Sequence, residues 1–389
     1  MNTSLLQERE TPFYHYDLSL LQSTLDHLLA AARDLPNCHI HYAVKACATP
    51  AVLRTIAQAG LGADCVSGGE VRAAFAQGFP ADKIVFAGVG KADWEIRLAL
   101  EIGISCFNVE SLPELENINA IAREMGKTAR VAFRINPNVD AHTHAKITTG
   151  LNENKFGLAM DDMLPTIRHA WSLSHVEYVG LHFHIGSQIT DMLPFVHLAE
   201  RINTLQDQLE QAGITTASIN VGGGLGVDYD HPDAHPIPDF EAYFDVFRRY
   251  LCLRPLQSLH FELGRSVVAQ CGSLISRVLY VKQGHEKQFV IVDAGMTDLL
   301  RPALYGSRHQ AVNLSAEGEK AEALYDIVGP ICESSDVFLT DYRLPTTHRG
   351  DLIAFRTAGA YGEIMASQYN CRRLPGHLIE PADSNALAQ

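Results

Sequence analysis

Short apolar runs rich in β-branched and aromatic residues alternate with longer amphipathic segments between residues 39 and 265. The amphipathic segments, among them DWEIRLALEIG and LAERINTLQDQLEQAG, have apolar residues at helical spacing and end in Gly, which is common just after a helix. Eight strands with helical crossovers predict an α/β protein with a (β/α)8 TIM-type barrel, although a doubly wound open sheet shares this pattern. The eight β-like runs are HIHYAVK (39–45), ADCVS (63–67), KIVFAG (83–88), SCFNV (105–109), ARVAFRI (129–135), VEYVGLHFHI (176–185), SINVG (218–222) and SLHFE (258–262).

The pattern changes after residue 266. Runs such as SLISRVLYVK, QFVIVDAG and DLIAFRTAGAYG are β-rich, are separated by turn residues and have no long helical period. They predict a C-terminal all-β domain. The stretch TPFYHYD near the N-terminus also has the character of a strand, and we expect it to pair with that domain. The expected domains are a barrel over residues 25–265 and a β-rich domain built from residues 1–24 and 266–389.

Composition and charge narrow the choice of partners. The 389 residues include 31 basic and 45 acidic side chains, for a net charge of −14. This acidic excess argues against binding to nucleic acid or to an anionic membrane. No run approaches the roughly 18 consecutive apolar residues of a membrane span, and MNTSLLQERETPF lacks the features of a signal peptide. We therefore expect a cytoplasmic protein. Its eight cysteines lack C-x-x-C spacing, so neither a zinc ribbon nor a disulfide framework is predicted.

Polar residues follow several of the predicted strands, at the end of a barrel where catalysis takes place. Lys45 ends HYAVK, where it could be a solvated rim residue or a desolvated amine that condenses with a carbonyl, most commonly that of pyridoxal phosphate. Gly222, Gly223 and Gly224 follow the seventh run. Glycines there allow backbone N–H groups to approach a phosphate, although the alternative is a mobile turn.

The end of the eighth run, ELGR, carries a carboxylate and a guanidinium. Glu262 could hold the proton on a pyridine nitrogen and Arg265 could bind a substrate carboxylate, or the two could form a buried ion pair. His182 and His184 are expected on one face of a strand, because side chains alternate. Since H-x-H also begins the zinc site of some barrel hydrolases, a metal hydrolase remains an alternative.

The predicted β-rich domain carries further candidates. Cys332 lies in CESSD, where a thiol with a reference pKa of about 8.5 could protonate a carbanion, although an arbitrary cysteine is usually an inert buried thiol. Arg301 and Tyr305 lie in RPALYG, and Tyr361 lies in GAYG.

Taken together, these motifs resemble the diaminopimelate decarboxylases, which are fold-type III pyridoxal-phosphate enzymes with an alanine-racemase-like barrel. The resemblance extends over nearly the whole chain and follows the family's motif order. The motifs are YAVKA, SGGE, NPNVDAHTH…TGLNENKFG, HFHIGSQ, GGGLG, ELGR, RPALYG, GPICESSD and GAYG.

The resemblance implies a role for each candidate residue and no metal. Lys45 would form the Schiff base with pyridoxal 5′-phosphate, His184 would stack on its ring, and Cys332 would be the proton donor. Leu263 stands where the family usually has Pro, so the fixed φ of that position is lost. The other implied cofactor-binding residues are Ser187, Gly222, Gly223, Gly224, Glu262, Leu263, Gly264, Arg265 and Tyr361. The implied substrate-binding residues are Arg265, Arg301, Tyr305 and Tyr361, with Glu333 for the distal ammonium.

The implied reaction converts meso-2,6-diaminopimelate into L-lysine and CO2, the last step of lysine biosynthesis. The implied assembly is a homodimer in which CESSD of one chain reaches the barrel of the other. A related decarboxylase for ornithine, arginine, carboxynorspermidine or a carrier-bound amino acid is the alternative within this class. A non-catalytic pyridoxal-phosphate carrier is a rival from another class, but such proteins lack a second domain.

Overall fold

The structure, a computed structural model, describes residues 6–139 and 155–381. The chain divides into two compact units. The barrel unit comprises residues 25–226 and 239–265, and the β-rich unit comprises residues up to Thr24, Val227–Pro238 and the chain from Ser266 onward. The observed barrel unit therefore differs from the expected range of 25–265 in one segment, because Val227–Pro238 belongs to the β-rich unit.

Side chains of the β-rich unit hold Val227–Pro238. Arg356 Nη2 lies 2.8 Å from Asp233 Oδ1, and Gln270 Nε2 donates a hydrogen bond to the carbonyl of His235. The sequence VDYDHPDAHPIP has neither helical nor strand periodicity, so tertiary contacts such as these assign it to the β-rich unit.

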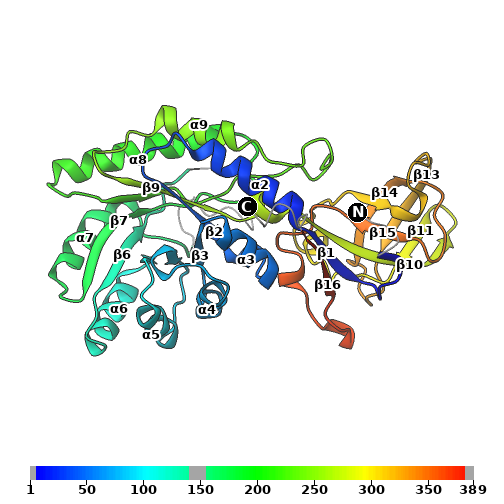
Figure 1. The fold of residues 1–389 in the computed structure, drawn as a ribbon, viewed down its shortest axis with the longest axis horizontal. Coiled ribbons are helices and arrows are strands. Elements are labelled where there is room, and N and C mark those ends of the chain that lie inside the picture. Colours follow the sequence, from blue (N-terminus) through cyan, green and yellow to red (C-terminus); the bar gives the residue numbers. More distant parts are fainter. Residues whose placement is uncertain (1–5, 140–154, 382–389) are drawn as a thin grey trace. The chain divides into compact units, whose positions relative to one another are not determined.

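The barrel unit is a closed barrel of eight parallel strands in chain order, as predicted, and the open-sheet alternative is wrong (Figure 1). Closure pairs the first strand with the last, with Cys38 opposite Leu259 and Tyr42 opposite Leu263. The strands are β2 (Cys38–Ala43), β3 (Gly62–Cys65), β4 (Ile84–Phe86), β5 (Cys106–Val109), β6 (Ala129–Arg134), β7 (Val176–His182), β8 (Ser218–Asn220) and β9 (Ser258–Leu263).

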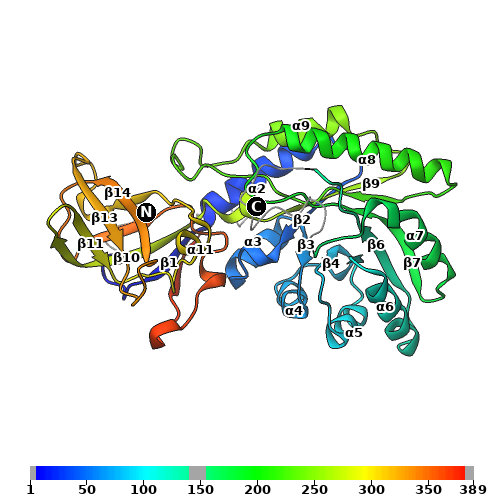
Figure 2. The ribbon, with the colours of Figure 1, turned by 180° about the vertical axis from the view of Figure 1, so that it is seen from behind.

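Helices cover the outside of the barrel strands, as both views show (Figures 1 and 2). Ser67, Ser111 and Asp239 cap three of them by accepting a backbone N–H of the first turn through their side-chain oxygens. Residues 140–154 of the motif NPNVDAHTH…TGLNENKFG lie outside the described residues. The helices are α2 (Leu18–Ala32), α3 (Pro50–Gln58), α4 (Gly68–Ala76), α5 (Asp93–Ile102), α6 (Leu112–Glu124), α7 (Met163–Ser172), α8 (Leu193–Gln211) and α9 (Phe240–Tyr250).

The β-rich unit is built on a sheet with the order β12-β15-β10-β11-β13-β14. The predicted strand TPFYHYD is β1, which pairs antiparallel with β10 and parallel with β16. The elements are β1 (Phe13–Asp17), β10 (Gly272–Gln283), β11 (Gln288–Val292), β12 (Ala311–Asn313), β13 (Ala323–Val328), β14 (Val337–Leu344), β15 (Leu352–Phe355) and β16 (Gly376–Glu380), with the short helices α10 (Arg265–Val268) and α11 (Arg301–Tyr305).

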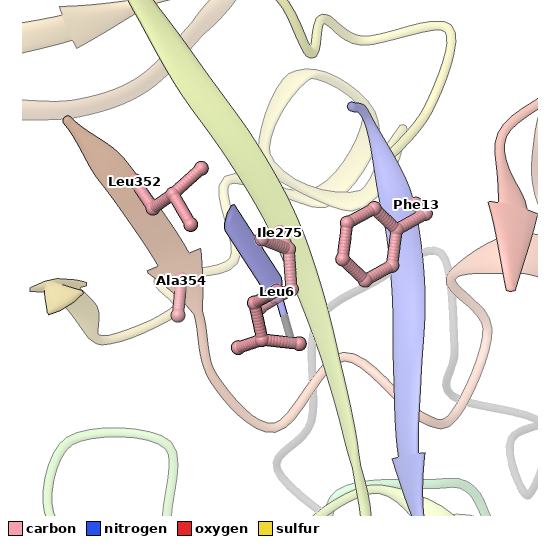
Figure 3. Close-up of a cluster of buried hydrophobic side chains, with 5 residues drawn as sticks. All are labelled: Leu6, Phe13, Ile275, Leu352 and Ala354. Carbon is pink, nitrogen blue, oxygen red and sulfur yellow. The ribbon is translucent and has the colours of Figure 1, made fainter. Parts of the chain in front are cut away.

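An apolar cluster joins the N-terminal strand to the sheet (Figure 3). Its members are at most 3% exposed, so β1 is fastened by packing as well as by its backbone ladder. The cluster consists of Leu6, Phe13, Ile275, Leu352 and Ala354. In the described parts of the chain, the helices are too short or too polar to cross a membrane.

Candidate active site

Lys45 lies in the single turn Val44–Ala46 that follows β2, at the C-terminal end of the barrel strands. Its Nζ is 3.3 Å from Oδ2 of Asp64 on β3. Asp64 is fully buried, and burial followed by the charge of Glu262 raises its pKa, although Lys45 opposes the shift. Our sequence reasoning missed Asp64. The only signal for it was an acid inside the otherwise apolar run ADCVS.

Glu262 lies in β9 and is held by side chains from three other strands. Its Oε1 accepts hydrogen bonds from Asn108 Nδ2 at 3.0 Å and from Asn220 Nδ2 at 2.7 Å. Its Oε2 accepts from His182 Nε2 at 2.9 Å. Burial alone would raise the pKa of Glu262, but the charge and hydrogen bond of His182 and the charge of Lys45 lower it well below its ordinary value. The carboxylate is therefore ionised. A carboxylate offers about four acceptor positions, so one more donor can be bound.

His184 lies just beyond β7, which ends at His182, so the two histidines do not belong to one strand as expected. The Gly223 N–H donates to His184 Nδ1 at 3.4 Å, which leaves the ring proton on Nε2. Burial, followed by the positive charges of Lys45 and Arg134, holds the pKa of His184 well below its ordinary value. The imidazole is therefore neutral at physiological pH.

The glycine loop after β8 is packed so closely that side chains do not fit. A Cβ on Gly222, whose φ is +72°, would lie 2.3 Å from the carbonyl oxygen of Phe183. A Cβ on Gly223 would lie 1.9 Å from the carbonyl oxygen of Glu262. Asn220 Oδ1 accepts the Gly222 N–H at 2.9 Å, so the same amide binds both the glycine loop and Glu262. Gly224 follows with a φ of +116°.

Arg265 and Ser187 are brought together. Ser187 Oγ lies 3.1 Å from Nη2 and 3.3 Å from Nε of Arg265. Leu263 is fully buried as the last residue of β9, and a Cβ on Gly264 would lie 3.0 Å from that of Ala43. The ELGR segment is thus fitted against the strand that leads to Lys45.

In the β-rich unit, Cys332 and Glu333 are exposed on the loop between β13 and β14. Cys332 is therefore not buried in this chain. Asn370 Oδ1 accepts the Cys332 N–H at 3.2 Å, and Glu333 Oε1 accepts the Tyr369 hydroxyl at 2.8 Å.

Asp336, the last residue of CESSD, is buried and fixes the conformation of this loop through hydrogen bonds to backbone N–H groups. Its carboxylate accepts the N–H of Met296 at 2.6 Å and that of Ile331 at 2.7 Å. A Cβ on Gly329 would lie 2.3 Å from that carboxylate, which explains the glycine of GPICESSD. Burial raises the pKa of Asp336, while the hydrogen bonds from Ile331 and Met296 oppose the shift.

Arg301 begins α11 and is 5% exposed. The rings of Tyr305, Tyr361 and Tyr229 surround its guanidinium, with centroids 5.6, 5.9 and 5.6 Å from Cζ. Tyr229 lies in the segment Val227–Pro238, and our sequence reasoning did not single it out.

The predicted residues thus divide between the units. Within the barrel unit, they gather at the C-terminal ends of the strands. Within the β-rich unit, Arg301 and Tyr361 share one cluster, and Cys332 and Glu333 lie on one loop. The H-x-H pair does not form a metal site: His182 is bound to Glu262, and in the described ranges no group of three His, Cys, Asp or Glu side chains is arranged to hold a metal ion.

Comparison with known proteins agrees with this geometry. The family model described as pyridoxal-dependent decarboxylase, pyridoxal binding domain, matches residues 21–269. The chain therefore belongs to the pyridoxal-dependent decarboxylases. A diaminopimelate decarboxylase of Bacteroides thetaiotaomicron is 62% identical over 366 residues, covering 94% of each chain. Within its class, the chain belongs to the diaminopimelate decarboxylases.

Solved structures are consistent with this placement. The crystal structure of diaminopimelate decarboxylase from Helicobacter pylori complexed with L-lysine is 40% identical, with a TM-score of 0.91 over 98% of this chain and 94% of that one. The Vibrio vulnificus lysine/ornithine decarboxylase complexed with putrescine reaches a TM-score of 0.84 over 98% of this chain and 97% of that one, at 23% identity. The Vibrio structure therefore shares the fold and supports no closer comparison.

Proposed function

We propose that the protein removes CO2 from the D-configured centre of meso-2,6-diaminopimelate and releases L-lysine. The observation that carries the proposal is the Glu262 carboxylate, held by Asn108, Asn220 and His182 in the same barrel end as the Lys45 amine. The chain is 62% identical to a protein named for this reaction, which favours meso-diaminopimelate over ornithine or arginine as the substrate.

The barrel residues fit pyridoxal 5′-phosphate. Lys45 offers the amine, and Asp64 accepts from that amine through one oxygen while its other oxygen has no hydrogen-bond partner among the described residues. The neutral His184 offers a flat ring face, and Glu262 retains an acceptor position for the pyridine N–H. The glycine loop and Ser187 would hold the phosphate, because backbone N–H groups and a hydroxyl are suitable donors to it.

Bound there, the cofactor supplies an electron sink for the pair left behind when the carboxylate departs. Glu262 would hold the proton on the pyridine nitrogen, which the sink requires. Cys332 donates the proton that replaces CO2 at the Cα. Arg265, Arg301 and Tyr305 bind the distal carboxylate and Glu333 binds the distal ammonium, while Tyr361 contacts both substrate and cofactor.

The working assembly in this proposal is a cytoplasmic homodimer. The amine and the glycine loop belong to the barrel unit, whereas Cys332 and Glu333 belong to the β-rich unit. A two-fold axis would create two equivalent composite sites, each taking its barrel from one chain and its CESSD loop from the other.

The test is CO2 release from meso-diaminopimelate, L-ornithine and L-lysine. We expect release from meso-diaminopimelate alone. Borohydride reduction and peptide mapping should then place a pyridoxyl group on Lys45, and the label should vanish in Lys45→Ala but persist in Lys83→Ala, which alters an exposed lysine. Release from ornithine alone would overturn the substrate assignment, and a label elsewhere would overturn the assignment of Lys45.

A further inference from the structure

We propose that Tyr229 is a positioning residue for substrate recognition: it completes a cage of tyrosine rings that orients Arg301 toward the distal carboxylate. This inference rests on the proposed function, because it takes the Arg301 guanidinium as the group that binds that carboxylate.

The first step concerns Arg301. Its side chain is buried, and a guanidinium remains charged at any physiological pH. Aromatic faces attract such a cation within about 6 Å of the ring centroid, and Tyr229, Tyr305 and Tyr361 all lie inside that limit. Three rings around one guanidinium restrict its position, and a guanidinium held in one position binds a carboxylate with little loss of entropy.

The second step concerns the origin of the rings. Tyr305 belongs to α11, the same short helix as Arg301, and Tyr361 lies in GAYG. Tyr229 instead comes from Val227–Pro238, the segment that interrupts the barrel sequence and belongs to the β-rich unit. The cage is therefore incomplete without that segment.

The third step concerns how Tyr229 is held. The Asp228 Oδ1 accepts the N–H groups of Asp230 at 2.9 Å and His231 at 2.8 Å, which fixes the turn around Tyr229. The ring of His309 meets that of Tyr229 edge to face, with centroids 5.1 Å apart and planes at 81°. His309 is 2% exposed, and its Nδ1 lies 3.0 Å from the carbonyl oxygen of Arg356. Tyr229 is thus fixed on the side of His309 while its ring faces Arg301.

The fourth step concerns Asp233, which anchors the far part of the segment. The ion pair between Asp233 and Arg356 and the hydrogen bond from Gln270 to the His235 carbonyl fasten the segment to the same unit as α11. These contacts within the β-rich unit hold the segment that carries Tyr229.

The experiment compares ligands with and without the distal carboxylate on the holoenzyme. L-lysine retains that carboxylate, and cadaverine lacks it. Tyr229→Leu should raise both the KM for meso-diaminopimelate and the inhibition constant of L-lysine about tenfold, with kcat and the inhibition constant of cadaverine within about twofold of wild type. Tyr229→Phe, which keeps the ring, should behave as wild type.

The matched control is Tyr280→Leu. Tyr280 also lies under an arginine, with Arg349 Cζ 5.1 Å from its ring centroid, but on an exposed strand position. Its loss should leave all four constants unchanged. If Tyr229→Leu does not fold, a trifluorinated phenylalanine can replace Tyr229, because it keeps the shape of the ring but weakens the negative charge on its face. This replacement should raise the inhibition constant of L-lysine but not that of cadaverine.

Two outcomes would overturn the inference: equal losses for L-lysine and cadaverine, or no loss for L-lysine with either replacement. Arg301→Lys separates this failure from failure of the proposed function. If Arg301→Lys weakens L-lysine binding while the Tyr229 replacements do not, only the cage is wrong. If Arg301→Lys has no effect, the role of Arg301 in the proposed function fails as well.

Discussion

An enclosed carboxylate stays ionised only when its neighbours supply donors and positive charge, and the barrel gives Glu262 both. Two asparagine amides and His182 bind its oxygens. Burial would raise its pKa, but the charge and hydrogen bond of His182 and the charge of Lys45 lower it. Burial and then the charge of Glu262 raise the pKa of Asp64, and the single amine of Lys45 only opposes this shift. When the pKa values of two neighbouring carboxyl groups shift in opposite directions, one stays protonated while the other is ionised, as is typical of active sites.

Cys332 provides the first prediction at the scale of single residues. Cys332→Ala should retain the bound cofactor and slow turnover by about 10²–10⁴-fold, because it removes the exposed thiol that we propose as the general acid. Steady-state CO2 release measures this. Cys252→Ala, which removes another exposed thiol, is the control and should turn over normally. Near-normal turnover of the Cys332 variant would mean that the thiol is not the proton donor.

Glu70 provides a prediction about pH. Burial, opposed by a hydrogen bond from the Val66 N–H, raises the pKa of Glu70 from 4.5 to about 7. Between these values the folded state keeps a proton that the unfolded state releases, so the contribution of Glu70 to the free energy of unfolding should fall as pH rises through this window. Above it the contribution is constant.

Glu70→Gln should flatten this slope, because the amide does not titrate. Urea midpoints measured at a series of pH values would show it. Glu101→Gln, at an exposed position of α5, should retain the wild-type slope. A wild-type slope in Glu70→Gln would show that another group titrates in this window.

At the scale of elements, the loop after β8 depends on steric exclusion as well as on backbone freedom. Gly222 and Gly213 both have a φ of +72°, but a Cβ on Gly213 would have no heavy atom within 4 Å. In Gly213→Ala, the strain of a left-handed alanine should therefore lower the free energy of unfolding by only about 1–2 kcal/mol. The variant should retain the cofactor.

Gly222→Ala carries the same strain plus a clash with the Phe183 carbonyl, worth about 1–3 kcal/mol more. The displaced loop should also bind pyridoxal phosphate more weakly. Urea denaturation and equilibrium dialysis of the cofactor measure the two effects. Equal behaviour of the two variants would contradict a phosphate-binding role for this loop.

At the scale of the whole molecule, the proposed catalytic groups lie in different units, and the homodimer proposal can be tested by complementation. Lys45→Ala chains should be inactive, and Cys332→Ala chains should retain about 1% of wild-type activity or less. Mixed and reassembled at random, half of the dimers would be heterodimers with one intact site of two, so about a quarter of wild-type activity should return.

Subunit exchange must be verified by mass spectrometry of differently tagged chains. Continued inactivity after confirmed exchange would place each site within one chain. Mixing two batches of Lys45→Ala gives the baseline, because no pairing there can restore an amine.

Local patterns in the sequence were sufficient for the eight barrel strands, their helices and the strand β1, because strand and helix periodicity extend over only a few residues. They were also sufficient to place Lys45 and the glycine loop directly after strands. The partners of Glu262 required the closed barrel, because Asn108 precedes it by 154 residues and nothing local couples the two. The contact between Asp64 and Lys45 could not be predicted either, because it forms only when β3 pairs with β2.

The segment Val227–Pro238 shows the remaining limit. Its sequence has no periodicity, so its membership of the β-rich unit and the packing of Tyr229 against Arg301 are decided by contacts with residues at least 35 positions away in the chain. Hydrophobic patterning by itself thus determined which elements form. Only the tertiary structure decided which polar side chains meet, because hydrogen bonds and ion pairs depend on separations of a few ångströms between residues remote in sequence.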